Sequence, residues 1–270
     1  MQLYWSAHSI SMKLTYDINT LVPYINWVYF YHAWQLKQPV EQQKIKAEAE
    51  QFLMSLENRY HAYALFQILD AHSDGDDIVL LPSNKRLPCL RQQDVSPCLS
   101  LADFIHPEQD KVGIFVTSVD RGMEQDFDAD PYQKMMAQLL ADRLAEAAAE
   151  LMHLQVRTHY WGYAADEHLS VAELHLEHFQ GIRPAVGYPS LPDASINFLL
   201  DELLDMKQVG VSLTESGAMR PHASVSGLMI SHPQARYFSV GRIGNDQLCD
   251  YAARRGMNVE KIRKFLSANL

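Results

Sequence analysis

Apolar side chains recur every three or four residues in the segment that follows Pro39. Ile45, Ala49 and Leu56 mark this apolar face, and the residues between them are mostly Glu, Gln, Lys and Ala. Helix formers with this spacing are typical of an amphipathic helix, which we predict over 40–61.

The longest uninterrupted helical pattern begins near Asp130. Aspartate at the N-cap, followed by proline at the first helical position, is a common helix start. Neither glycine nor another proline occurs from there to about His153, so we predict a long central packing helix. Shorter helices are expected within 19–34, after the capping box at 170–173, and over 195–206, 246–254 and 259–266.

Strand patterns occupy the middle of the chain. Apolar runs at 63–69 and 78–81 are separated by a cluster of Asp and Gly at 74–77, which predicts a hairpin. The β-branched run Val112–Val119 predicts a buried strand.

Two further segments complete the prediction. Residues 83–98 contain two prolines and many polar side chains, so we expect a loop there. The runs 223–230 and 237–243 are expected to be paired strands around a turn at 232–233.

The order of these elements favours an α+β fold with a mostly antiparallel sheet and long helices. Strands and helices do not alternate regularly, and no G-x-G-x-x-G follows a strand, which disfavours a dinucleotide-type parallel sheet. We predict a single domain over 1–270, with a helical N-terminal region over 1–62 and an α+β body over 63–270.

Composition narrows the classes of partner. Hydrophobic residues make up 47% of the chain, enough for a sizeable core, and 23 basic against 33 acidic side chains give a formal net charge of −10. This charge disfavours nucleic acid and anionic membrane surfaces as partners. The three cysteines, without C-x-x-C spacing, suggest neither a disulfide framework nor a zinc site, and no metal site is expected.

Targeting signals are not evident in the sequence. No apolar run approaches the roughly 18 residues that span a bilayer, and Met1–Ser11 lacks a charged segment followed by an apolar one. We therefore expect a cytoplasmic protein.

The loop Gly181–Pro189 carries the most suggestive chemistry. Its glycines let the backbone approach a flat ligand, Arg183 offers a fork for a carboxylate, and Tyr188, directly after Gly187, supplies an aromatic face. The same composition also suits an ordinary proline-rich surface loop, so these residues alone leave both interpretations open.

Several motifs, in order, resemble the reactivation domain of cobalamin-dependent methionine synthase. R-P-A-x-G-Y-P at 183–189 is preceded by Y-W-G-Y at 160–163 and followed by L-T-E-S at 213–216. The other matching motifs are P-Y-I-x-W at 23–27, L-A-D-F at 101–104, A-D-R-L-A-E-A at 141–147, A-S-V-S-G at 223–227, S-H-P at 231–233, and D-Q at 246–247 leading to D-Y-A-x-R-x-G-M at 250–257. The resemblance covers most of the chain.

This resemblance implies that the chain binds S-adenosylmethionine on a concave surface and presents its methyl group to cobalamin held by a partner. In the family, that methyl and an electron from a flavodoxin-type reductant restore methylcobalamin from cob(II)alamin. The chain has room for this module alone, so it is expected to act in trans, as a component of methionine synthase with no catalytic residue of its own. The partner would be the cobalamin-binding module of methionine synthase or another corrinoid protein.

The resemblance also assigns site residues. Arg183 is expected to hold the ligand carboxylate, and Ala185, Gly187 and Tyr188 to line the adenosine. Tyr237 is expected near the corrin face. Glu146 and Glu177 match two carboxylates of the site.

Each of the last three assignments has a plainer alternative. Glu146 has Arg143 three residues before it and could form a helix-surface pair. Glu177 could be a solvated side chain, and Tyr237 a half-buried packing residue in a strand.

Two departures from the family pattern bear on function. Asn26 stands where the family has an aspartate, which removes a charge that would face the cationic ligand. The usual M-W-P-G-A-S is here M-R-P-H-A-S, with Arg220 and His222. The alternative function is therefore a non-catalytic binding module for a corrinoid protein that has lost methyl-donor function. A hydrolase is disfavoured because no G-x-S-x-G is present.

Overall fold

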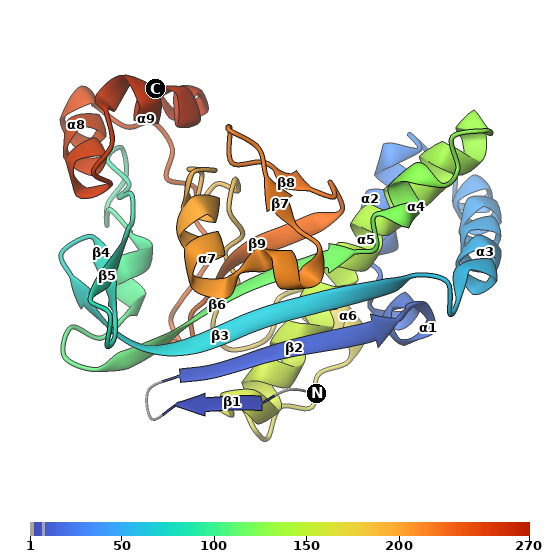
Figure 1. The fold of residues 1–270 in the computed structure, drawn as a ribbon, viewed down its shortest axis with the longest axis horizontal. Coiled ribbons are helices and arrows are strands. Elements are labelled where there is room, and N and C mark those ends of the chain that lie inside the picture. The colour runs from blue at the N-terminus through green and yellow to red at the C-terminus, as the bar shows by residue number, and fades with distance from the viewer. Residues whose placement is uncertain (1–2, 7–8) are drawn as a thin grey trace.

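A seven-stranded antiparallel sheet forms the centre of the protein. The computed structural model describes residues 3–6 and 9–270. Helix α5 (Pro131–Gln155) lies against one face of the sheet and α7 (Ile196–Leu204) against the other (Figure 1). The predicted α+β class with a mostly antiparallel sheet is confirmed.

The long strand β3 (His61–Asp74) organises the sheet. It pairs with β2 (Ser9–Asp17) along one edge and with β6 (Asp110–Val119) along the other, and β6 pairs in turn with β9 (Ser224–Met229). The remaining strands are β1 (Leu3–Ser6), β4 (Asp77–Leu80) and β5 (Lys85–Pro88) in the same sheet, and the separate pair β7 (Ser212–Leu213) and β8 (Met219–Arg220).

Alternating side chains of β3 divide the interior into two cores. Phe66 and Ile68 pack in the core that contains α5, whereas Leu65 and Leu69 pack in the core that contains α7. Successive side chains of a strand point to opposite faces, so a strand buried on both faces carries an almost continuous apolar run.

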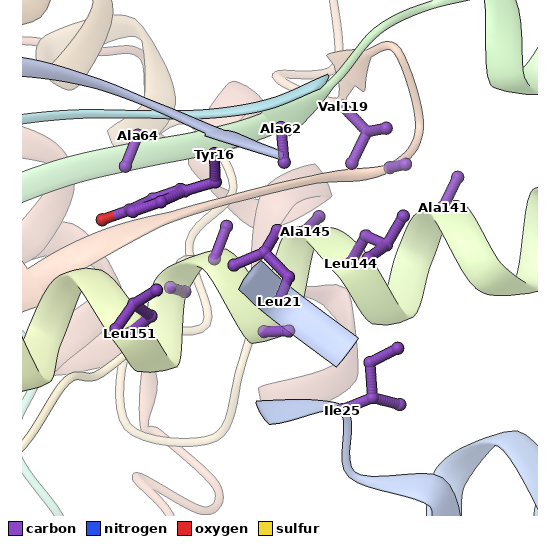
Figure 2. Packing of buried hydrophobic residues seen from close by; sticks show 14 of the residues in the cluster. Tyr16, Leu21, Ile25, Ala62, Ala64, Val119, Ala141, Leu144, Ala145 and Leu151 are labelled. Carbon is purple, nitrogen blue, oxygen red and sulfur yellow. The ribbon is translucent and has the colours of Figure 1, made fainter. Parts of the chain in front are cut away.

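Small side chains let α5 lie close to the sheet. Ala141, Ala145 and Ala148 are fully buried, and Figure 2 shows Ala145 among the residues between helix and sheet. The hydroxyl of Thr117 on β6 donates to the carbonyl of Ala145 at 2.9 Å. The position of α5 on the sheet is therefore fixed by close packing and by a buried hydrogen bond.

The other helices lie around this centre. Three helices within 18–56 and one at 122–125 contact α5, and the two C-terminal helices form a small core of their own. Arg254 attaches the latter to the sheet through the buried carboxylate of Asp77, at 2.6 Å. The helices other than α5 and α7 are α1 (Ile18–Leu21), α2 (Trp27–Ala33), α3 (Pro39–Leu56), α4 (Gly122–Gln125), α6 (Val171–His175), α8 (Asn245–Arg254) and α9 (Val259–Phe265).

Most predicted elements are present within a few residues of their expected bounds. The predicted hairpin is β3–β4, the buried strand is β6, and the long helix is α5. The capping box at Ser170 and Glu173 is formed as expected. The helix expected over 40–61 ends at Leu56.

Three predictions about elements were wrong. The region 1–62 is helical only in part, because β1 and β2 precede its helices. The expected loop 83–98 contains β5, which extends the β3–β4 hairpin. The segment 237–243 is irregular rather than a strand. Residues 182–186 occupy the edge of β9 where we expected that strand, through bridges of Ile182 to Ile230 and Ala185 to Gly227.

Within the described ranges, no helix is both long enough and apolar enough to cross a membrane. Residues 1, 2, 7 and 8 of the N-terminal segment that we inspected for a targeting signal lie outside the described residues.

Candidate functional site

Seven of the eight predicted site residues surround one pocket of about 630 Å³. Ligand sites for small molecules and cofactors commonly have a volume of this size. The pocket lies between α2, α5, the C-terminal end of α6 with Glu177, the loop 183–190 and the segment 237–239. The seven residues are Asn26, Glu146, Glu177, Arg183, Ala185, Tyr188 and Tyr237.

Gly187 shapes the loop from outside the pocket lining. Its φ is +88°, a conformation that side chains rarely adopt, and its N–H donates to the carbonyl of Leu191 at 2.8 Å. The tight turn places Tyr188 over the pocket.

The segment that carries Arg183 is held against β9 by backbone contacts. The N–H of Val186 donates to Ser226, and that of Leu228 donates to Pro184, at 2.9 and 3.0 Å. This approach requires glycine at 227, because a Cβ there would lie 2.3 Å from the Pro184 carbonyl oxygen.

Arg183 is fixed by three contacts. Its Nη2 donates to Oε2 of Glu150 and its Nη1 to Nδ1 of His153, each at 3.1 Å. Its backbone N–H donates to the hydroxyl of Tyr237 at 2.9 Å. The side chain of Arg183 is 13% exposed, so the guanidinium is largely shielded from water and still lines the pocket.

His153 is a fully buried partner of this arginine. Burial, and then the charges of Arg183 and Arg157, hold its pKa well below the ordinary value of 6.5. The imidazole is therefore neutral at physiological pH.

The two predicted carboxylates occupy different surroundings. Glu146 accepts a hydrogen bond from the Tyr188 hydroxyl at 3.3 Å, and its charge, together with partial burial, raises the pKa of Tyr188. The pKa of Glu177 is raised above its ordinary value, because the effect of partial burial exceeds the opposite effect of the nearby Arg183 charge. Both carboxylates line the pocket.

The alternatives that we raised for Glu146 and Tyr237 are not what the structure shows. Arg143 lies over the ring of Tyr29, 5.6 Å from its centroid, while Glu146 takes its hydrogen bond from Tyr188. Tyr237 packs in no strand, and its hydroxyl supports the Arg183 backbone.

Asn26 has a local structural role as well as a place in the pocket. It is the N-cap of α2, and its side-chain oxygen accepts from the N–H of Val28 at 3.2 Å. Arg220 and His222 are not among the lining residues. His222 is exposed, with Nδ1 3.5 Å from Oδ1 of Asp142.

Sequence reasoning missed Glu150 and His153. They follow Glu146 by four and seven residues on α5, and side chains with this spacing share one helix face. Three ionisable residues along one face of a predicted central helix were the available signal, because a buried helix face is normally apolar.

The comparisons with known proteins identify the family. A sequence profile described as "Vitamin B12 dependent methionine synthase, activation domain" matches residues 17–256. The chain belongs to this activation-domain family. Its structure is similar to one described as the crystal structure of the MetH reactivation domain bound to AdoHcy, with a TM-score of 0.91 and 37% sequence identity, over 96% of this chain and 90% of that chain.

The contact of the loop 183–190, called the binding loop from here on, with strand β9 can be tested at Gly227. We expect Gly227→Ala to push residues 184–186 off β9, because the new methyl group would overlap the Pro184 carbonyl, at a cost of about 1–3 kcal/mol in the free energy of unfolding. Hydrogen exchange at the N–H groups of Val186 and Leu228 should accelerate.

Gly113→Ala is the matched control for this substitution. Its added methyl would meet Cε and Cβ of Met229 and not the Pro184 carbonyl, so stability should fall while exchange at Val186 stays slow. Unchanged exchange at Val186 in Gly227→Ala would contradict the role assigned to this glycine.

The buried histidine predicts a pH dependence of stability. The folded protein keeps His153 neutral, whereas the unfolded chain protonates it near pH 6.5. Below that pH the unfolded chain binds more protons, so the free energy of unfolding falls on acidification by up to about 1.4 kcal/mol per pH unit. Between pH 7.5 and 5.5, the free energy of unfolding measured with urea should fall less steeply for His153→Asn than for the wild-type chain. The same substitution at the exposed His32, His32→Asn, is the control. Equal slopes for wild type and His153→Asn would refute the prediction.

Proposed function

We propose that this chain binds S-adenosylmethionine in the pocket and presents its methyl group to cobalamin held by a partner protein. The observation that carries the proposal is the joint presence of a buried arginine fork, three carboxylates and aromatic faces around one pocket. S-adenosylmethionine carries a carboxylate, an ammonium and a sulfonium group, and a flat adenine. The solved relative bound to AdoHcy supports this choice of ligand.

Arg183 is the group best placed to hold the carboxylate. Glu150 and His153 each use one N–H of the guanidinium, which leaves three of its five donors. A charge-assisted fork of this kind fixes orientation as well as affinity.

The adenosine would lie along the loop after Arg183. The N–H of Ala185 has no acceptor in the part of the chain that the structure describes, so it can donate to an adenine nitrogen. The ring of Tyr188, 55% exposed, can cover the adenine face. Glu146 and Glu177 supply negative charge for the cationic part of the ligand.

The proposed reaction is a reductive methylation. One electron from a low-potential, flavodoxin-type donor and a methyl group transferred from sulfur as CH₃⁺ convert cob(II)alamin to methylcobalamin, leaving S-adenosylhomocysteine. The methyl must lie in line between sulfur and cobalt, so the contribution of this chain is to position the donor and to limit access of water. Tyr237, 37% exposed at the pocket, is the residue we expect near the corrin.

Asn26 supports a second candidate function. Its side-chain oxygen is used by the helix N-terminus, and an amide carries no charge to attract a cation. A chain with weakened donor affinity could act as a non-catalytic binding module for a corrinoid protein. The presence of Glu146, Glu150 and Glu177 in the same pocket favours the donor function, because negative charge remains available.

Binding of the donor is the first test. Isothermal titration of the isolated chain should give a dissociation constant for S-adenosylmethionine in the micromolar to submillimolar range. Arg183→Ala should weaken binding by roughly 1.5–3 kcal/mol, because the carboxylate loses a charge-assisted hydrogen-bonded partner. Arg236→Ala, an exposed arginine beside Tyr237, is the control and should bind normally. Absence of binding at millimolar ligand would exclude the donor role and leave the binding module.

The partner role requires a second measurement. Mixed with a cobalamin-binding methionine synthase that lacks its own reactivation domain, S-adenosylmethionine and a low-potential reductant, the chain should convert cob(II)alamin absorbance to that of methylcobalamin. Tyr237→Ala should slow this conversion more than it weakens donor binding. Equal conversion without the chain, or methylation of homocysteine by the chain alone, would contradict action in trans.

A further inference from the structure

Two residues of α5 hold the Arg183 guanidinium from one side. Glu150 and His153 lie three positions apart on the helix and receive hydrogen bonds from Nη2 and Nη1, each at 3.1 Å. Oε1 of Glu150 is buried without a donor among the described residues. Glu150 therefore takes a single hydrogen bond and does not occupy the bidentate fork.

The contact with arginine determines the protonation of His153. A guanidinium can only donate, so Nδ1 must be an acceptor. The proton of the neutral ring is then on Nε2, which lies 3.3 Å from the hydroxyl oxygen of Tyr163. The ring also meets Phe179 edge to face, with centroids 5.1 Å apart, so its plane is fixed by packing.

A neutral acceptor suits a site for an anionic ligand group. A second carboxylate at this position would orient the guanidinium equally well, but its charge would repel the carboxylate of the ligand. A protonated imidazole would direct an N–H at the arginine and displace it. Neutral imidazole with a free Nδ1 lone pair avoids both effects.

We infer that His153 is a positioning residue for ligand binding, which orients Arg183 so that its free N–H groups face the carboxylate of the bound nucleoside. This inference rests on the proposed function and adds a residue to it. The opposite interpretation is that the contacts with α5 sequester Arg183 and weaken binding. The two differ in the sign of the effect when the acceptor is removed.

The test compares two variants and two ligands. His153→Phe keeps an aromatic ring against Phe179 and removes the acceptor, whereas His153→Asn keeps an oxygen acceptor near the position of Nδ1. S-adenosylhomocysteine carries the amino-acid group, and 5′-methylthioadenosine lacks it. The measured quantity is the ratio of the two dissociation constants, which a general loss of stability would not change.

We expect His153→Phe to weaken S-adenosylhomocysteine binding about tenfold, the value of one hydrogen bond to a charged group, and to leave methylthioadenosine binding within about twofold of wild type. His153→Asn should restore most of the ratio. An unchanged ratio in His153→Phe would overturn the inference, and a ratio shifted in favour of S-adenosylhomocysteine would show sequestration. Failure of wild-type chain to bind either ligand would instead contradict the proposed function.

A measurement on the wild-type chain covers the case in which His153→Phe does not fold. Nitrogen-15 NMR of histidine-labelled protein at neutral pH should show His153 as the neutral tautomer protonated at Nε2, with His153→Asn identifying its signal. A proton on Nδ1 would overturn the inference, because that nitrogen could not accept from Arg183.

Discussion

The pocket depends on the close approach of residues 182–186 to the edge of β9. That approach sets the path of the chain on both sides of Arg183, and only glycine at 227 leaves room for it. The contact joins the sheet, the binding loop and the irregular segment that contains Tyr237. A backbone contact at the edge of the sheet thus determines where the Arg183 guanidinium lies in the pocket.

Helix α5 serves the fold and the site at the same time. One of its faces packs small alanines against the sheet, and another presents Glu146, Glu150 and His153 to the binding loop. Because the helix is fixed on the sheet by close packing, these polar groups have little freedom to shift. A rigid element that carries both roles gives the site more precise geometry than a loop would.

Much of the fold and part of the pocket lining could be predicted from the sequence. The helical periodicity of α5 and the β-branched run of β6 are strong local patterns, and motif resemblance located seven lining residues. Strand β2 was missed although Ile10, Met12, Leu14 and Tyr16 alternate with polar residues, which is the standard strand signal.

Other features depended on partners distant in sequence. The β-type residues of 237–243 form no strand, because the edge of β9 is already occupied by a segment about fifty residues earlier. The hydrogen bond of His153 with Arg183 joins residues thirty positions apart. Local patterns contain no information on either contact. Asn26 was placed at the pocket by motif position, but its use as a helix cap is visible only in the structure.

The charge balance of the pocket has a consequence for turnover under the proposed function. Three carboxylates face two arginines in its lining, and the whole chain carries a formal charge of −10. The donor is a net cation, and its product, which has lost the sulfonium charge, is electrically neutral. Transfer of the methyl group would therefore remove part of the attraction that retained the nucleoside, so that the same carboxylates that favour loading of the donor also favour exchange of the spent molecule for a fresh one.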